Sequence, residues 1–557
     1  METGTVVKRF AMDVLALCFS VRHGFWRSQA CLLAIFCFLA MAWPGFAQTR
    51  SGTLVALGGG SENVELIQEV LELARGRDSQ VLILNTASSN PAQSGAAYER
   101  FFQQRLGVKR AAVLPLLSRD QAYDPAILSL IGEADLIYAT GGNQIRLAQV
   151  IQGTPAHGAL LAAWQRGVVL AGTSAGAMVW GPNYITSGLS ASALRRGISP
   201  GSLELRDGLG LLPDVLVDTH FGREGRLGRL LVASAQSPGV WGLGVDEGTA
   251  AVVTSEGVRV LGEGRVSLLD FSRARVKRPL RPPISMRDVE MHILGAGESL
   301  RWRREENERV PMLSPPVRLP LEAAALWLQG KESVPSSLVA ADDSKTAAFA
   351  PLPEELLVLA GNDAISLAQR WQSALTSAGR TTVRILSADQ VRSPLLTKYL
   401  TIAGGLLLVE DPAGTLASAL RGNPGNVLRE HLKRLQCLAA AATVGIVGEP
   451  ATRTTAAGRA DLAPGLRFAP GMVATPDVWR VGALERLAVD ALLANGAIGI
   501  GLTPSNGIRL VGHRINAWGD DPVLVLETGK VSLANPALSS ARDLRLHLMA
   551  PGDSLSY

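Results

Sequence analysis

The sequence predicts an α/β fold in which a mainly parallel β-sheet is present twice, once in each half of the chain. Short apolar runs alternate with longer amphipathic runs from Gly52 onward, as in LVALGGG followed by NVELIQEVLELARG. Such alternation is typical of strands joined by crossover helices. Several segments then recur in the same order in the second half, as expected for a repeated unit. With 557 residues, 47% hydrophobic and 18% charged, the chain can form several buried cores and is not intrinsically disordered.

The overall charge is nearly balanced, with 54 basic and 49 acidic residues and a formal net charge of +5. The sequence contains no run of five like charges, whereas arms that bind nucleic acid are typically rich in basic residues. We therefore expect no nucleic acid among the partners of this protein.

The N-terminus has the pattern of a secretory signal. Residues 30–43 are apolar and uncharged, Arg22 and Arg27 precede them, and PGFA follows, ending at the small residue Ala47. The apolar run is shorter than the ~20 residues of an ordinary membrane span. We expect residues 1–47 to be a signal peptide of a bacterial protein that is periplasmic or secreted, with no stable membrane anchor after cleavage. An uncleaved anchor is the alternative.

Cysteine and histidine spacing argues against disulfides and metal sites in the mature chain. Three of the four cysteines lie in the predicted signal peptide, so only Cys437 remains after cleavage and no intramolecular disulfide can form. Cys437, His431 and His513 do not have the spacing of metal ligands. We expect neither a metal ion nor an organic cofactor.

The motif GTSAG, directly after the apolar run VVLA, is the strongest chemical signal. It matches the Gly-x-Ser-x-Gly nucleophile elbow, a tight strand-to-helix turn that exposes the serine. Ser174 is therefore the predicted nucleophile. The amide of Ala175, together with that of Gly141 or Gly142, is the predicted oxyanion hole. The alternative is a glycine-rich helix start without chemistry.

A serine nucleophile needs a base, which a third group orients. His220 is the candidate base because it ends the predicted strand VLVDTH. His157, among helix-forming residues, and His292, in an alternating strand, compete with it. Because a histidine base must be neutral to accept a proton, the rate is predicted to fall in acid.

The orienting acid is predicted at the end of another strand, in WGLGVDEGTA. Glu247 is the candidate and Asp246 is its competitor. Successive side chains of a strand point to opposite sides, so only one of the two is expected to face the site.

From about residue 52 to 302 the chain resembles the cyanophycinases, which belong to the serine peptidase family that also contains aspartyl dipeptidase. Four motifs in order carry the resemblance: Gly-Gly-Asn143-Gln144, the GTSAG motif, Asp218-x-His220-Phe with Arg226-Leu-Gly-Arg229, and Gly-x-Asp-Glu247-x-Thr-Ala.

The resemblance implies a class I glutamine-amidotransferase-like, flavodoxin-like three-layer sandwich. It implies a triad of Ser174, His220 and Glu247, which would cleave cyanophycin into β-aspartyl-arginine dipeptides. Cyanophycin has a polyaspartate backbone whose side-chain carboxyls carry arginine. The residues that would bind this substrate are Gln144, Asp218, Thr219, Arg226 and Arg229.

The chemistry of the two arginines agrees with an acidic substrate. Arg226 and Arg229 are three residues apart and can share a helix face, from which forked donors bind carboxylates. The alternative is an exposed basic helix face. Thr219 stands where the resemblance leads us to expect glutamine, and Glu224 where it leads us to expect arginine. Another aspartyl or isoaspartyl peptide is therefore an alternative substrate.

The sequence predicts a catalytic domain at 51–302, a linker at 303–353 and a degenerate copy at 354–557. TLVALGGGS at 53 matches ELLVLAGND at 355, and RDVEMHILGAGESL at 287 matches RDLRLHLMAPGDSL at 542. The alternative is an unrelated second domain.

The second copy has lost the chemical residues of the first. In the sequence alignment the counterparts of Gln144, Ser174, His220 and Glu247 are Ala413, Pro450, Asp477 and Pro504. We expect an inactive domain that replaces a dimer partner or binds polymer, although an oligomer is also compatible with the sequence.

Two other functions are compatible with the same residues. One is an aspartyl dipeptidase-like exopeptidase, which would cleave dipeptides rather than polymer. The other is a non-catalytic exported binding protein, in which Ser174 would not react.

Overall fold

The computed structural model describes residues 52–556 apart from several internal segments. These segments are 61–62, 238, 278–279, 303–324, 330–352, 378–381, 412–413, 441–447, 450, 455–459, 464–468, 477, 480–486, 489–490, 492–497 and 529–540. The predicted signal peptide lies outside the described residues, as do Ala413, Pro450, Asp477 and most of the predicted linker. Among the described helices, none is both long enough and apolar enough to cross a bilayer.

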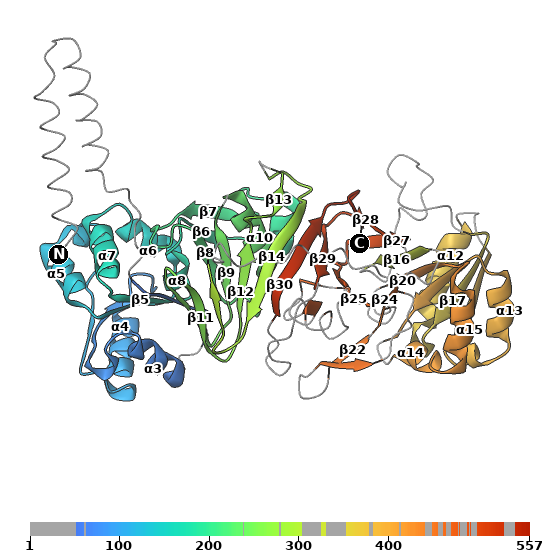
Figure 1. The fold of residues 1–557 in the computed structure, drawn as a ribbon, viewed down its shortest axis with the longest axis horizontal. Coiled ribbons are helices and arrows are strands. Elements are labelled where there is room, and N and C mark those ends of the chain that lie inside the picture. Colours follow the sequence, from blue (N-terminus) through green and yellow to red (C-terminus); the bar gives the residue numbers. More distant parts are fainter. Residues whose placement is uncertain are drawn as a thin grey trace, which may run out of the picture. The chain divides into compact units, whose positions relative to one another are not determined.

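An eight-stranded sheet forms the centre of the N-terminal half, residues 52–302 (Figure 1). Its strands are, in spatial order, β15 (Ser299–Arg301), β11 (Gly257–Gly262), β10 (Thr249–Val253), β1 (Leu54–Leu57), β5 (Val169–Thr173), β4 (Leu136–Ala139), β2 (Gln80–Leu84) and β3 (Arg110–Val113). The five strands from β1 to β3 pair in parallel, and the other three pair antiparallel. The sheet is therefore mixed but mainly parallel.

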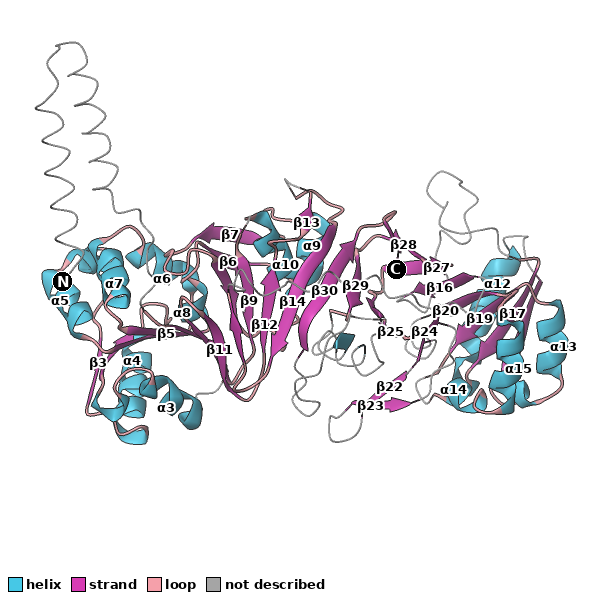
Figure 2. Ribbon diagram, in the orientation of Figure 1, coloured by secondary structure: helices cyan, strands magenta, loops and turns pink. Residues whose placement is uncertain are grey.

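Helices cover both faces of this sheet (Figure 2). In β1, Leu54 and Ala56 enter one hydrophobic core and Val55 and Leu57 enter the other, as the two-residue period of a strand requires. The helices of one face are α5 (Pro125–Glu133), α6 (Gln144–Ile151) and α7 (Pro155–Gln165), and those of the other are α3 (Val64–Glu72) and α4 (Pro91–Arg100). This is the predicted α/β architecture.

A second sheet, of nine strands, contains strands from both halves of the chain. Its strands are, in spatial order, β25 (Met472–Thr475), β26 (Ile498–Gly501), β29 (Val523–Glu527), β30 (Ala541–Met549), β14 (Met286–Leu294), β12 (Val266–Asp270), β9 (Trp241–Val245) and β8 (Val215–Asp218), with β13 (Arg275–Val276) beside β14. Two helices of the N-terminal half, α9 (Ser190–Arg196) and α10 (Leu227–Gln236), share a hydrophobic core with this sheet. The antiparallel pair of β14 and β30 joins the two halves.

A third sheet, of eight strands, lies in the C-terminal half, residues 325–556. Its strands are, in spatial order, β18 (Thr382–Ser387), β17 (Glu355–Ala360), β19 (Gly405–Val409), β20 (Gln436–Ala440), β16 (Ala325–Gln329), β27 (Asn506–Val511), β28 (Arg514–Gly519) and β31 (Ser554–Ser556). The described helices of this half include α12 (Ile365–Ser377), α13 (Leu395–Ile402), α14 (Thr415–Ala419) and α15 (Asn423–Leu432).

Strand β16 corrects the prediction that 303–353 is only a linker. It pairs in parallel with β20 and antiparallel with β27, and the side chain of Leu328 is fully buried. Local propensity is a weak guide to a strand that is buried between two others, because pairing with its neighbours overrides that propensity. The C-terminal half therefore begins at least as early as Ala325.

The first and third sheets contain the same series of parallel and antiparallel pairs, read from β15 and from β31. In that series β16 has the position of β1, and β17 has the position of β2. The sequence match that paired residue 53 with residue 355 is therefore wrong by one strand. It aligned two similar apolar runs, β1 and β17, and left out β16.

The register of the two sheets also bears on the sequence counterpart of the predicted nucleophile. Cys437 of β20 takes the place of Leu170 of β5. Ser174 lies four residues beyond Leu170, and Ala441 lies four residues beyond Cys437 in the sequence. Ala441 and Pro450, the counterpart predicted from the sequence alone, both lie outside the described residues.

Candidate active site

Ser174 occupies a strained turn between β5 and the short helix α8 (Ala175–Met178). Its backbone has φ 53° and ψ −122°, a conformation that L-residues rarely adopt. A Cβ on Gly172 would lie 2.4 Å from the carbonyl oxygen of Gly176, so the turn requires glycine there. This backbone is the strained strand-to-helix turn that the GTSAG motif predicts.

His220 lies two residues beyond the end of β8 and faces Ser174. Its Nε2 is 2.9 Å from Ser174 Oγ. Its backbone also has a positive φ, 48°, and its N–H donates to the carbonyl oxygen of Gly58 at 2.8 Å. The loop after β8 is thereby attached to the end of β1, and the imidazole is held against the serine.

Glu247, just beyond β9, completes the line of hydrogen bonds. Its Oε1 is 2.6 Å from His220 Nδ1. The neighbouring Asp246 instead accepts a hydrogen bond from the N–H of Gly222 at 2.8 Å. With the proton on Nδ1 donated to Glu247, Nε2 is left to accept the Ser174 hydroxyl proton, which is the arrangement of a serine nucleophile, a base and an orienting acid.

The competing histidines lie elsewhere. His157 uses Nδ1 to accept from the N–H of Gly153, and its Nε2 is 2.7 Å from the carbonyl oxygen of Leu209. His292 lies in β14, where its Nδ1 accepts from the N–H of Asp543 at 3.2 Å. Both rings therefore satisfy backbone groups.

Three consecutive glycines, Gly58 to Gly60, lie against the imidazole of His220 and the side chain of Glu247. A Cβ on Gly59 would lie 2.4 Å from His220 Cε1, and one on Gly60 would lie 3.1 Å from Glu247 Cβ. Both glycines have positive φ. Sequence reasoning identified this run only as a turn. The signal that could have revealed its role is three glycines at the carboxyl end of a strand beside the nucleophile strand.

Arg223 is a further residue that sequence reasoning missed. Its Nη1 donates to Glu247 Oε2 at 2.6 Å, although the side chain is 71% exposed. The hydrogen bonds from His220 and Arg223 hold the pKa of Glu247 below its usual range. Glu247 therefore stays ionised, with each oxygen bound to a donor. A basic residue three positions after the candidate base was the available signal.

The predicted oxyanion amides lie beside the serine. Ala175 is the first residue of α8, and its N–H has no partner within the helix by position. A Cβ on Gly141 would lie 3.3 Å from Ser174 Cβ, whereas one on Gly142 would lie 2.2 Å from the carbonyl oxygen of Ala87. The loop of Gly141 and Gly142 is therefore packed between the nucleophile and the end of β2.

Gln144, at the start of α6, binds backbone rather than open space. Its Nε2 lies 3.1 Å from the carbonyl oxygen of Ile185 and 3.4 Å from that of Thr186. Its side-chain amide thus ties α6 to strand β6 (Asn183–Ser187).

Asp218 and Arg229 form a buried ion pair. The Asp218 side chain is fully buried, and Arg229 donates to both of its oxygens, at 2.6 and 2.7 Å. Thr219 is also fully buried. These three residues are therefore buried behind the site. The carboxylate of Asp218 binds arginine side chains and does not face solvent.

Arg226 has its entire guanidinium engaged. Nη1 donates to Asp218 Oδ1 at 3.2 Å and to the carbonyl oxygen of Thr219 at 2.8 Å. Nε and Nη2 both donate to Glu224 Oε2, at 3.0 and 2.5 Å. Glu224 thus occupies the outward side of the Arg226 fork, where an external carboxylate would otherwise bind.

An open hollow of about 550 Å³ reaches the outer side of Glu247. It is lined by Gly60, Asn63, Val64, Glu65, Arg105, Glu247 and Gly248. The carboxylate of the site is therefore next to open surface on the α3 side.

We expect Gly59→Ala to disable the site without unfolding the chain. The added methyl group would overlap the imidazole of His220, and displacing a reacting group by about 1 Å costs on the order of a hundredfold in rate. The measurement is the rate at which a fluorophosphonate probe labels Ser174.

Gly153→Ala is the matched control for Gly59→Ala. Gly153 also has positive φ, 68°, but nothing lies within 4 Å of its added Cβ. The control variant should have the same kind of backbone strain but label Ser174 at the wild-type rate. Equal labelling in both variants would contradict the role given to Gly59.

Comparison with known proteins identifies the family of this chain. Residues 54–261 match the model of peptidase family S51. The cyanophycinase of Synechococcus elongatus is 32% identical over 279 residues, covering 48% of this chain and 84% of that protein. The cyanophycinase of Geminocystis herdmanii is 32% identical over 268 residues, covering 46% and 96%. The crystal structure of a peptidase from an acI-B1 Actinobacterium aligns with 24% identity and a TM-score of 0.35, over 46% of this chain and 98% of that one. The chain belongs to peptidase family S51 and is a serine-type peptidase.

Proposed function

We propose that residues 51–302 cleave the polyaspartate backbone of cyanophycin, leave its β-aspartyl–arginine bonds intact, and so release β-aspartyl-arginine dipeptides. The observation that carries this proposal is the continuous line of hydrogen bonds from Ser174 through His220 to Glu247. The relatives named cyanophycinase support the choice of substrate.

In the proposed reaction, Ser174 Oγ attacks the carbonyl carbon of the scissile bond while its proton passes to His220 Nε2. The amides of Ala175 and of the Gly141–Gly142 loop stabilise the negative oxygen of the tetrahedral intermediate. His220 then returns the proton to the leaving amine, and a water molecule, activated by the same base, releases the acyl group from the serine. Glu247 orients His220 and stabilises its charged form.

Charge near the site bears on the substrate. Each arginine of cyanophycin is attached through its α-amino group, so the polymer has free α-carboxylates near the scissile backbone amide. The forked donors of Arg226 suit such a carboxylate. That arginine is already bound to Glu224. A substrate carboxylate must therefore displace the Glu224 carboxylate, which weakens its binding relative to a site without this acid.

We expect Ser174→Ala to abolish release of soluble dipeptide from insoluble cyanophycin, because no other nucleophile completes the line of hydrogen bonds. Product is measured by chromatography of the supernatant after incubation with the wild-type chain and the variant. Equal release by both would contradict the nucleophile. No release by a folded wild-type chain would contradict the substrate.

We expect Glu224→Ala to lower the KM for β-aspartyl-arginine oligomers with free α-carboxylates by about 1.4- to fivefold. The Glu224–Arg226 ion pair is surface-exposed on the side of Glu224, and such pairs contribute roughly 0.2–1 kcal/mol. Peptides with an amidated α-carboxyl should keep their KM in Glu224→Ala. Glu133→Ala, which changes an exposed acid outside the site, should leave the KM of both kinds of peptide unchanged. An unchanged KM for both peptides in Glu224→Ala would contradict this competition.

The departure at Glu224 also favours a second candidate, an exopeptidase that acts on small aspartyl or isoaspartyl peptides. Polymer size separates the two candidates. Cleavage of a β-aspartyl dipeptide together with inert polymer would favour the exopeptidase. A Ser174 that does not react with a fluorophosphonate, in a chain that cleaves no peptide, would favour a non-catalytic binding protein.

We also propose that the chain is exported, with residues 1–47 removed. The charge and hydropathy pattern of this segment supports the proposal. Sequencing of the N-terminus of protein isolated from the periplasm or medium should find the chain beginning near Gln48. A chain that retains residues 30–43 would contradict cleavage.

We further propose that the two halves are copies of one class I glutamine-amidotransferase-like domain, the second without catalytic activity. The common strand order of the first and third sheets supports this. Ala441 and Pro504 stand where the first half has Ser174 and Glu247, and neither can serve as a nucleophile or an acid. Residual cleavage by Ser174→Ala would contradict an inert second half.

A further inference from the structure

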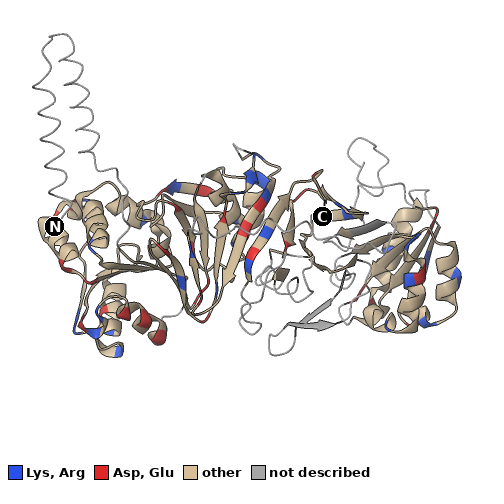
Figure 3. Ribbon diagram, viewed as in Figure 1, with Lys and Arg blue, Asp and Glu red and all other residues tan. Residues whose placement is uncertain are grey.

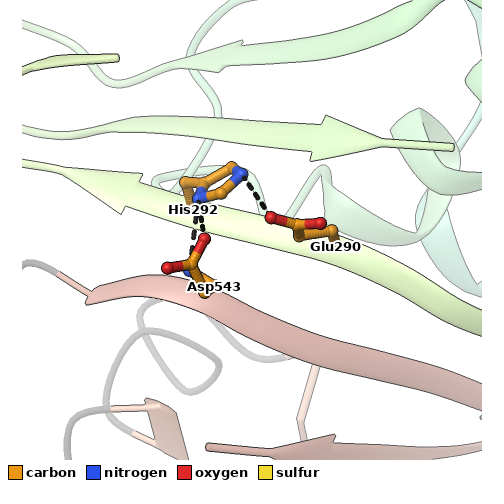
Figure 4. A group of neighbouring side chains, drawn as sticks. All are labelled: Glu290, His292 and Asp543. Atoms are coloured by element: carbon orange, nitrogen blue, oxygen red, sulfur yellow. Dashed lines mark hydrogen bonds and ion pairs between the residues drawn. The ribbon is translucent and has the colours of Figure 1, made fainter. Parts of the chain in front are cut away.

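The two halves are joined by a reciprocal pair of hydrogen bonds. The N–H of Asp543 in β30 donates to His292 Nδ1 at 3.2 Å, and the N–H of Asp288 in β14 donates to His547 Nδ1 at 3.3 Å. Both aspartates have positive φ, 58° and 57°. Figure 4 shows the first of these contacts, with His292 between Asp543 and Glu290. The pairing is thus two-fold symmetric about the centre of the β14–β30 ladder.

This cluster is not a metal site in our interpretation, although Glu290, His292 and Asp543 lie near one another. The Nδ1 lone pair of His292 is already used by a backbone N–H. The symmetric position has Arg545 in place of Glu290, and a cation there opposes a metal ion. The shared feature of the two positions is the histidine that satisfies a backbone amide.

The same junction brings the C-terminal half against the loop that follows His220. A Cβ on Gly225 would lie 2.5 Å from the carbonyl oxygen of Trp479. Trp479 and Val478 join the hydrophobic core that contains Phe221 and Leu227. Loop 221–229, a name in which we include the first turn of α10, therefore rests directly on backbone and side chains of the C-terminal half.

An ion pair provides a second, charged attachment. Arg195 of α9 donates through Nε and Nη2 to the two oxygens of Asp521, the Nη2 bond being 2.7 Å long. Asp521 is 4% exposed and also accepts from Thr503 Oγ1 at 2.9 Å. The carboxylate is therefore held in place within the C-terminal half before it binds Arg195.

Helix α9 transmits this attachment to the loop. Ser190 Oγ donates to the carbonyl oxygen of Gly225 at 2.6 Å and accepts from the N–H of Arg229 at 3.3 Å. Gly188, just before the helix, accepts from Arg229 Nη1 at 2.9 Å. The two ends of α9 thus connect Asp521 with the loop that carries Arg223, Arg226 and Arg229.

We propose that the C-terminal half is a positioning element for the active site, and that Asp521 and Arg195 are positioning residues that hold loop 221–229 in place. His220 itself is held by Gly58, Ser174 and Glu247, so the attachment acts on the arginines of the loop rather than on the nucleophile and base. This inference rests on the proposed function for its effect on substrate binding.

The test compares Arg195→Gln, Asp521→Asn and the double variant with the wild-type full-length chain. We expect the KM for a soluble oligomer of β-aspartyl-arginine units to rise by about tenfold, with kcat and the fluorophosphonate labelling rate of Ser174 nearly unchanged, as for loss of binding without loss of chemistry. Because the two residues act as one pair, the double variant should resemble each single variant. Arg195 is half-exposed, so Arg195→Gln remains informative if Asp521→Asn fails to fold.

Ser285→Ala is the matched control, because Ser285 Oγ also binds across the two halves, to Asp553 at 2.6 Å, and this hydrogen bond involves neither α9 nor loop 221–229. Hydrogen–deuterium exchange of the amides of 221–229 measures the attachment independently of any substrate, and exchange should be faster in Arg195→Gln than in Ser285→Ala. Unchanged exchange and a KM within twofold of wild type, or the same changes in Ser285→Ala, would overturn the inference. Faster exchange in a chain whose wild type cleaves no β-aspartyl peptide would instead overturn only the proposed substrate.

Discussion

The close approach of backbone at Gly58, Gly59 and Gly60 is the constraint on which the site depends. The end of β1 belongs to the first sheet, whereas His220 and Glu247 follow strands of the second sheet. The carbonyl oxygens of Gly58 and Gly59 accept from the amides of His220 and Gly248 at 2.8 and 3.1 Å. Side chains on these glycines would separate the two sheets or expel the imidazole. The triad geometry is therefore a consequence of how two sheets meet, and no single sheet contains it.

The sequence predicted the parts of the site that have a local signature. Ser174 lies in a motif whose turn requires glycines on both sides, and strand alternation predicts that only one of Asp246 and Glu247 faces the site. The environment of Asp218 and the contact of Arg223 with Glu247 could not be predicted in this way, because both depend on how a loop folds back after β8. The sequence does not show whether a charged residue in such a loop binds substrate or a neighbouring side chain.

The fold was predictable to the same extent and for the same reason. Alternating strands and helices indicate a parallel sheet, but the identity of β16 could not be recovered from its five residues. Its neighbours β20 and β27 are more than 100 residues away along the chain, and only their pairing distinguishes a strand from an apolar helix. Missing that strand displaced the match between residues 53 and 355 by one strand.

The junction explains why some residues recur in both halves while the chemical ones do not. Replacing His292 or His547 would leave a backbone amide of a positive-φ aspartate without its acceptor, at a cost of roughly 1–3 kcal/mol where it is buried. At the centre of the same ladder Glu290 lies opposite Arg545, and these two residues are each other's counterparts in the repeated segment. Figure 3 shows charged residues of both signs along β14 and β30. Two copies of the first half would place Glu290 opposite Glu290, whereas like charges directly opposite each other destabilise a sheet. The charge difference therefore favours pairing between the two halves of one chain over pairing of two identical halves.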